Sequence, residues 1–427
     1  MPRRITALNT ALSALALVAS TAFAQALPEP AAPPAAPTGM KGAELLPALV
    51  EHSRSRLELQ GGRLAGEGLP ALRRLLAPTQ FVLLGEDHFV SGIADFATAL
   101  WQELQPLGYR HAVLEADRWS VAQLEQRLAC GDALQPWLQT QGGAGTIPFY
   151  TLAPEVRWLQ AIVGSQPAPR GPRLWGVDQV FLGGVPLVLD TVAREASDPE
   201  ARRQAQAFVD ASRGNLQWLP KVPVAELEAL HARLKAQPPL AERVRALIDS
   251  RAIYQPFTGG EGEAWAANER REQGMRRDFL RHYRAAEKQE GAPPKAMAKL
   301  GANHLFQGAS TTWVQSFGNA LVELARQHDR ATLSMLVLCA PGGQSGTFQG
   351  GEAPCNAARY GGDWAFIEPF LHTDAITVFD LRTWRLRPGR FAHLSHGVQR
   401  AVAGFDLLVF VPSGPPARFL EGLQPPR

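Results

Sequence analysis

Two short segments of the chain repeat one pattern of residues that can do acid–base chemistry. Residues 84–92 read LGEDHFVSG and residues 300–308 read LGANHLFQG, so Leu, Gly, His and a final Gly match. The polar members are Glu86, Asp87, His88, Asn303 and His304. A single Gly-x-x-His pattern is more often a surface or core histidine, but its repetition favours one shared functional site.

Two further carboxylates follow short apolar segments. Glu115 ends Ala112-Val113-Leu114-Glu115, and Asp178 ends Leu174-Trp175-Gly176-Val177-Asp178. A glutamate in this position can also pair with a neighbour such as Arg118. We expect Glu115 to act in catalysis, and Asp178, Asp87 and Asn303 to bind substrate.

Glu86, His88, Glu115 and His304 are compatible with two mechanisms. In the first, His88 or a carboxylate is the general base for a water molecule, and the other groups orient it and stabilise an oxyanion. In the second, the histidines and one or two of the glutamates bind a divalent metal ion that activates water. The cofactor is therefore either none or a divalent metal ion, and residue types alone do not separate the two.

Other catalytic motifs are missing from the sequence. It contains no Gly-x-Ser-x-Gly segment, which disfavours a serine hydrolase. It also lacks the glycine-rich loops that bind nucleotides, so a nucleotide cofactor has no support.

The elements that would position these residues alternate along the chain. Short apolar segments with β character occur at residues 80–84, 111–115, 173–176, 298–301, 331–339, 375–379 and 407–411, separated by helical patterns. This predicts an α/β fold with a mainly parallel sheet flanked by helices. The carboxyl ends of parallel strands meet at one edge, so we expect His88 and His304 in one cleft with Glu86 and Glu115.

A long stretch between the third and fourth segments has almost no strand signal. Over residues 187–290 apolar residues recur at helical spacing, which predicts a large helical insertion within a single α/β catalytic domain spanning residues 40–427. Arg271 and Met275 are four residues apart and share one helix face, so we expect Arg271 to point towards the site. The alternative is that this arginine merely coats an exposed helix, as Arg270 and Arg277 would.

The first residues have the features of an export signal. Arg3 and Arg4 precede an apolar stretch at residues 11–19, and Ala22-Phe23-Ala24 provides small residues for cleavage. The apolar stretch is shorter than the ~20 residues that span a membrane. We therefore interpret residues 1–24 as a signal peptide and 25–39 as an Ala/Pro-rich tether, and expect a periplasmic or secreted protein without a stable membrane anchor.

Composition narrows the functional classes. Hydrophobic residues make up 45% of the 427 residues and charged residues 19%, which is enough to form a large core. Lys plus Arg number 43 against 40 for Asp plus Glu, without a long basic run, so a nucleic-acid partner is disfavoured. The expected partner is a small-molecule or peptide substrate.

The three cysteines fit an oxidising compartment. Cys339 and Cys355 flank a glycine-rich loop, which predicts a disulfide between them. Cys130 remains, and we expect a free, buried thiol at the end of a helix.

At these motifs the chain resembles the erythromycin-esterase-like group and its wider superfamily of ChaN-like, TraB-like and Tiki-like proteins. The resemblance extends from about Gln80 to Phe419. Its segments are Gly85-Glu86-Asp87-His88, Val113-Leu114-Glu115, Trp175-Gly176-Val177-Asp178, Arg271-Glu272-Gln273-Gly274-Met275, Gly301-Ala302-Asn303-His304 and Phe405-Asp406-Leu407-Leu408-Val409-Phe410.

The resemblance implies an α/β fold and a hydrolase in which water attacks a macrolactone ester. The catalytic residues that it implies are Glu86, His88, Glu115, Arg271 and His304. Two departures leave the macrolide substrate open. Asp87-His88-Phe89 stands where the esterases usually have Thr-His-Gly, and neither Leu300 nor Ala302 supplies their second late histidine.

Three functional classes follow. The first is an exported hydrolase that cleaves an ester or amide bond, favoured because acids, histidines and an arginine converge. The second is a metal-dependent Tiki/TraB-like peptidase with Glu86, His88, Glu115 and His304 as its ligands. The third is a ChaN-like haem- or iron-binding uptake protein, although the chain has only five tyrosines to offer as ligands.

Overall fold

The computed structural model describes residues 26–426 except 36–37, 261 and 356–362. The expected signal peptide therefore lies outside the described residues. The described part of the Ala/Pro-rich segment contains no helix or strand before Gly42. It contacts the folded chain, because Arg382 and Arg390 donate hydrogen bonds of 2.8 Å to the carbonyl oxygens of Pro28 and Pro34.

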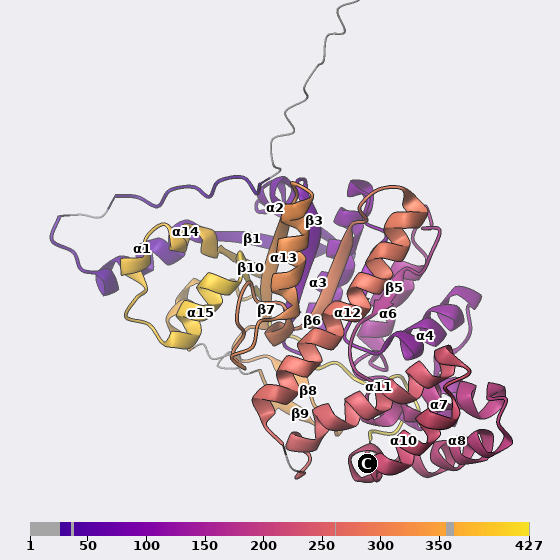
Figure 1. Cartoon of the computed structure of the whole chain (residues 1–427). Coiled ribbons are helices and arrows are strands. Elements are labelled where there is room, and N and C mark those ends of the chain that lie inside the picture. The colour runs from indigo at the N-terminus through magenta and orange to yellow at the C-terminus, as the bar shows by residue number, and fades with distance from the viewer. Residues whose placement is uncertain (1–25, 36–37, 261, 356–362, 427) are drawn as a thin grey trace, which may run out of the picture.

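Nine strands form one mixed sheet (Figure 1). Their spatial order is β2 (Arg63–Ala65), β1 (Arg54–Gln60), β10 (Ile376–Asp380), β11 (Leu407–Val411), β7 (Ala331–Cys339), β3 (Thr79–Glu86), β6 (Ala296–Gly301), β4 (His111–Leu114) and β5 (Leu174–Gly176). All pairs from β11 to β5 are parallel, whereas β2, β1 and β10 add antiparallel pairs at one side. The predicted α/β fold with a mainly parallel sheet is confirmed.

The central strands are apolar on both sides because helices cover both faces. Every residue of β3 is buried, with Val82 and Leu84 in one core cluster and Phe81 and Leu83 in the other. This arrangement explains why these strands read as continuous apolar runs rather than alternating ones.

Each face has its own set of helices. The side chains of α2 (Leu69–Leu76), α3 (Ser91–Leu104), α4 (Arg118–Cys130), α5 (Leu134–Gln141) and α6 (Ala153–Val163) belong to the first cluster. Those of α1 (Gly42–Ser53), α12 (Ala264–Glu290), α13 (Phe317–Gln327), α14 (Leu381–Arg385) and α15 (His396–Gly404) belong to the second. A separate hairpin of β8 (Gln344–Gly346) and β9 (Glu352–Pro354) lies in the glycine-rich loop.

The region expected to be a helical insertion is helical in the structure. It contains α7 (Val185–Glu195), α8 (Pro199–Ser212), α9 (Trp218–Lys221), α10 (Val224–Arg233) and α11 (Pro238–Tyr254), followed by α12. The first five helices share a third apolar cluster and group together at the lower right of Figure 1. In contrast, α12 runs back along the sheet and buries Met275 and Phe279 against it.

The cysteines give one confirmation and one correction. Cys339 and Cys355 form a disulfide, as predicted. Cys130 is free but exposed, so the expectation of a buried thiol is wrong. The buried face of α4 carries Val121 and Leu124, whereas Cys130 is the last helical residue before Gly131 turns the chain at the surface.

No helix in the described part of the chain is long and apolar enough to cross a membrane.

Candidate active site

Four neighbouring strands place polar side chains at their carboxyl ends. Glu86 is the last residue of β3, and Glu115 directly follows β4. Asp178 lies two residues after β5, and His304 lies three residues after β6. Because β3, β6, β4 and β5 are adjacent and parallel, these side chains converge at one edge of the sheet.

His88 stands at the centre of this group. Its Nδ1 is 3.0 Å from Oε1 of Glu86, and its Nε2 is 3.5 Å from Oε2 of Glu115. The imidazole stacks on the ring of Phe149 at a centroid distance of 3.7 Å. Burial alone would lower the pKa of His88, but the carboxylates of Glu115 and Glu86 outweigh it and hold that pKa above its ordinary value.

Glu115 connects both histidines. Its Oε2 accepts a 2.6 Å hydrogen bond from the backbone N–H of Gly301, while its Oε1 lies 2.8 Å from Arg271 and 3.4 Å from Nε2 of His304. Burial raises the pKa of Glu115, but His304, His88 and Arg271 prevail and hold it well below its usual range. Glu115 is therefore an ionised carboxylate, held by the backbone N–H of Gly301 and the guanidinium of Arg271.

His304 is held more rigidly than His88. Its Nδ1 lies 2.6 Å from Oε1 of Glu272, whose Oε2 accepts a 2.5 Å hydrogen bond from the backbone N–H of Phe317. Burial and Arg271 lower the pKa of His304, whereas Glu272 and Glu115 raise it, with a net value of about 9. His304 is consequently a cation at neutral pH.

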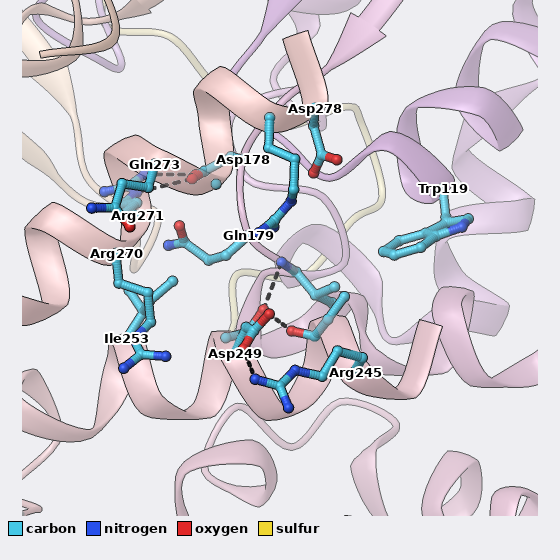
Figure 2. Close-up of a pocket in the computed structure, with 15 residues that line it drawn as sticks. Trp119, Asp178, Gln179, Arg245, Asp249, Ile253, Arg270, Arg271, Gln273 and Asp278 are labelled. Atoms are coloured by element: carbon cyan, nitrogen blue, oxygen red, sulfur yellow. Dashed lines mark hydrogen bonds and ion pairs between the residues drawn. The ribbon is translucent and has the colours of Figure 1, made fainter. Parts of the chain in front are cut away.

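Arg271 points from α12 into the site, as its helix face predicts. It forms two hydrogen bonds to Asp178, of 2.9 and 2.6 Å, in addition to its contact with Glu115. Figure 2 shows Arg271 and Asp178 joined in this way, beside a neighbouring cavity that both residues also line. Arg270 and Arg277 line that cavity, of about 220 Å³, and neither lines the cavity at His88.

Lys299 and Glu155 complete the site and were not expected from the sequence. Lys299 lies within β6 with a side chain 1% exposed, 2.5 Å from Oε2 of Glu86. Glu155, in the first turn of α6, accepts two bonds from the same ammonium group at 2.8 and 2.9 Å. The available sequence signal was a lysine inside the apolar strand Ala-Met-Ala-Lys-Leu-Gly.

The two remaining predicted residues, Asn303 and Asp87, differ in their position relative to the cavity. Asn303 lines the cavity, and its Oδ1 accepts a hydrogen bond of 2.5 Å from Thr311. Asp87 is buried beside the site but does not line the cavity, and its backbone N–H bonds to Val337. The structure thus brings the predicted histidines, Glu86, Glu115, Arg271 and Asp178 into one cluster, while the catalytic and binding roles stay predictions.

A cavity of about 370 Å³ opens above this cluster. Its lining combines His88, Glu115, Asp178, Arg271, Asn303 and His304 with the aromatic side chains of Phe149, Phe181 and Tyr254. The aromatic wall was not expected, because it comes from loops and from the helical insertion rather than from strand ends. Such a mixture of a few polar groups with apolar walls is typical of small-molecule sites.

Gly301 forms part of the floor and has no room for a side chain. A Cβ atom there would lie 2.7 Å from Nε2 of His88 and 3.3 Å from Oε2 of Glu115. The glycine of the second repeated segment is thus required by the histidine of the first.

The four candidate metal ligands do not fit a divalent ion in this arrangement. Among the described residues, no group of three or more His, Cys, Asp and Glu side chains is placed to hold a metal ion. Lys299 and Arg271 occupy carboxylate oxygens of Glu86 and Glu115 that a metal ion would need. A cation bound there would have to displace buried ion pairs.

Known structures share this architecture. A succinoglycan biosynthesis protein matches with a TM-score of 0.59 and 14% identity, over 88% of this chain and 98% of that one. A Bacillus cereus protein matches with a TM-score of 0.58 and 13% identity, over 89% and 98%. A mutant of the erythromycin esterase EreC in its open conformation matches with a TM-score of 0.57 and 15% identity, over 86% and 99%.

These similarities define the fold of the chain. It is an α/β protein of the architecture seen in all three structures. That architecture is the fold of the erythromycin esterase EreC, so the resemblance in the motifs is confirmed at the level of the fold. No protein-family model and no curated protein matches the sequence.

Proposed function

We propose that the protein is an exported hydrolase in which His88 activates a water molecule to cleave an ester or amide bond. One observation carries this proposal: His88 lines the cavity, with its Nδ1 3.0 Å from Oε1 of the buried Glu86 and its Nε2 3.5 Å from Oε2 of Glu115. A carboxylate can only accept, so the shorter contact, to Glu86, assigns the proton of neutral His88 to Nδ1 and leaves the lone pair of Nε2, which is 3.5 Å from Glu115, to bind water.

His88 suits the role of general base better than its neighbours do. Glu115 is a weak base because the pKa of its carboxyl is held well below its usual range. His304 is a cation at neutral pH and has a 9% exposed side chain, compared with 19% for His88. His88 is therefore the more accessible of the two histidines, and its raised pKa makes it a stronger base than an ordinary imidazole.

The reaction proceeds in two steps. Water bound at Nε2 of His88 loses a proton to this nitrogen as its oxygen bonds to the substrate carbonyl carbon. The positive charges of His304 and Arg271 then stabilise the oxyanion. When the bond to the leaving group breaks, His88 returns the proton to the leaving oxygen or nitrogen, which restores the neutral imidazole.

Export is part of the same proposal. Its support comes from the signal-like residues 1–24 and from the disulfide between Cys339 and Cys355, which persists in oxidising compartments. Sequencing the N-terminus of protein recovered from a periplasmic or culture fraction tests it. If the recovered protein began at Met1, cleavage after Ala24 would be contradicted.

A substrate screen tests the hydrolase. The purified chain is assayed with p-nitrophenyl esters, lactones including a macrolactone, and aminoacyl p-nitroanilides, each with and without a chelator. We expect hydrolysis that survives the chelator and is lost in His88→Asn. The exposed His393, changed to Asn, is the matched control. Full activity in His88→Asn would contradict the proposal, and loss with chelator would favour the metal-dependent peptidase.

A further inference from the structure

A second cavity lies beside the catalytic one. It has a volume of about 220 Å³, and its lining comes mainly from α11, from α12 and from residues 178–180, which follow β5 (Figure 2). Asp178, Gln179 and Arg271 line both cavities, so these three side chains form a shared wall. A group bound in the second cavity would therefore lie next to the proposed reaction site.

The carboxylates of this cavity already have arginine partners, whereas two of its arginines have none. The three pairings, at 2.6, 3.2 and 3.9 Å, are Asp178 with Arg271, Asp249 with Arg245, and Asp278 with both Arg118 and Arg281. In the part of the chain that the structure describes, neither Arg270 nor Arg277 forms a hydrogen bond or an ion pair within 4 Å. The cavity thus has two guanidinium groups whose N–H donors the protein does not use.

Gly274 leaves space between these two arginines. Residues 270, 274 and 277 are four and three positions apart, so they share one face of α12, and all three line the cavity. Glycine is unfavourable in a helix interior, and its φ here is not positive, so the backbone does not require it.

Packing does not require this glycine either. Apart from the backbone of its own helix, the only described atom within 4 Å of a Cβ placed at Gly274 is a terminal nitrogen of Arg277, at 3.7 Å. Such a distance is ordinary van der Waals contact, so the fold has room for a side chain here. The glycine keeps open a space that the described chain does not fill.

We propose that this cavity binds a carboxylate or phosphate group, with Arg270 and Arg277 as its hydrogen-bond donors. The planar guanidinium group matches the oxygens of both anions in charge and geometry. The anionic group is either part of an acidic substrate that reaches His88 or a separate small anion. The first of these sources rests on the proposed function, whereas binding itself can be measured without any reaction.

Arginines that only keep an exposed helix solvated are the simpler explanation. That explanation suffices for Arg284, which is exposed on the same helix and lines neither of these two cavities. It does not account for the glycine between Arg270 and Arg277, because a solvated helix face favours alanine or a charged residue at that position. An anion bound between the two arginines accounts for all three residues.

Binding is tested by isothermal titration calorimetry of the full chain with inorganic phosphate and with succinate, at low ionic strength because the arginines are exposed. We expect Arg270→Gln and Arg277→Gln each to weaken binding about tenfold, the usual effect of losing a charged hydrogen bond. Arg284→Gln is the matched control, since it removes the same charge from α12 outside the cavity. No binding of either anion to the native chain, or equal weakening in the control, would overturn the inference.

Gly274→Ala gives an independent test. The added methyl group favours the helix and occupies the space between the arginines, so the variant should unfold at a higher temperature yet bind the anion more weakly. A variant that merely disturbed the fold would lose stability as well. Higher stability with unchanged anion binding would show that the space is not used, which contradicts the proposal.

Kinetics on paired esters separates the two sources of the anion. The pairs are p-nitrophenyl acetate and mono-p-nitrophenyl esters of dicarboxylic acids of increasing length. If the group belongs to the substrate, Arg270→Gln and Arg277→Gln should raise KM for an acidic ester only, and phosphate should compete with that ester. If a separate anion binds, phosphate should change kcat on both kinds of ester alike. Anion binding by a chain that hydrolyses nothing would support the site while contradicting the hydrolase.

Discussion

The two loops that share the Gly-x-x-His pattern hold their histidines in different surroundings. His88 is 19% exposed, stacks on Phe149 and lines the cavity, with its Nε2 3.5 Å from Oε2 of Glu115. His304 is 9% exposed and is bonded to Glu272, which raises its pKa and is itself anchored to the start of α13. In the proposed mechanism, the first loop supplies the accessible base and the second supplies a cation.

The shared sequence pattern determines where the two histidines lie, whereas contacts with residues outside the loops determine the surroundings of each imidazole. The loops lie against each other, since a Cβ atom at Gly85 would lie 3.0 Å from Cα of Ala302, and one at Gly301 would lie 2.7 Å from His88. The shared glycines are thus explained by mutual packing. The difference between the histidines comes from Glu272 on α12, outside both loops.

The largest effect should come from removing the accessible base. His88→Asn should lower kcat by ~10²- to 10⁴-fold, the usual contribution of a general base. In the native chain, activity should fall as the pH drops through the pKa of His88, which lies above its ordinary value, because the protonated imidazole cannot accept a proton. A pH–rate profile measures this, and an acid limb below pH 6 would be inconsistent with His88 as the base.

The next effect concerns Arg271. This cation contacts Glu115, which also contacts the histidines of both loops. Arg271→Ala should reduce kcat roughly 100-fold, because it removes a charge next to the developing oxyanion and releases Asp178. Arg284→Ala is the control on the same helix, since Arg284 is exposed and lines neither cavity. Equal losses in both variants would remove Arg271 from the mechanism.

Substitutions of Gly301 and Gly85 should have different effects, one on activity and the other on stability. Gly301→Ala should push His88 from its place and lower kcat by about tenfold, because the added methyl group meets the reacting nitrogen. Gly85→Ala instead meets the backbone of Ala302 and the ring of Phe405, so it should cost ~1–3 kcal/mol of stability. Thermal unfolding and kinetics on both variants check this, and a reversed pattern would contradict the packing explanation.

The last expected effect is on stability alone, a pH-dependent contribution from His304. Its pKa is about 9 in the folded chain against an ordinary value of 6.5, so it stabilises the fold fully below pH 6.5. This contribution, at most about 3 kcal/mol, is lost as the pH rises through 9. Glu272→Gln should reduce the difference in unfolding midpoint between pH 6 and pH 10. An unchanged difference would mean that Glu272 does not hold the charge on His304.

Sequence patterns predicted those parts of the site that are set by strand ends. The apolar segments before Glu86, Glu115 and Asp178 showed where parallel strands stop, and the sheet then brings their carboxyl ends together. Arg271 was predicted because it shares one helix face with Met275, four residues further along. These features are local, so a short window of sequence contains them.

Other parts depend on contacts between distant segments. Lys299 contacts Glu155 across 144 positions of the chain, and no local pattern connects a strand lysine with a helix glutamate. The strands β1 and β2 were missed because the sequence of β1, Arg-Ser-Arg-Leu-Glu-Leu-Gln, is mostly polar, as suits a strand near the sheet edge. Phe149 and Phe181 were missed because they lie in irregular loops.

The disulfide between Cys339 and Cys355 closes a loop that carries Phe348, whose ring lies 6.4 Å from Phe89 and 5.5 Å from Phe181, centroid to centroid. Phe181 is part of the cavity wall, so the covalent link closes a loop that packs against the wall of the candidate active site. Because this disulfide forms only in an oxidising compartment, the compartment in which the protein is expressed can affect the result of an assay. Material made in a reducing cytoplasm would lack this covalent link, and a screen run on such material would report the substrate preference of a less constrained cavity wall.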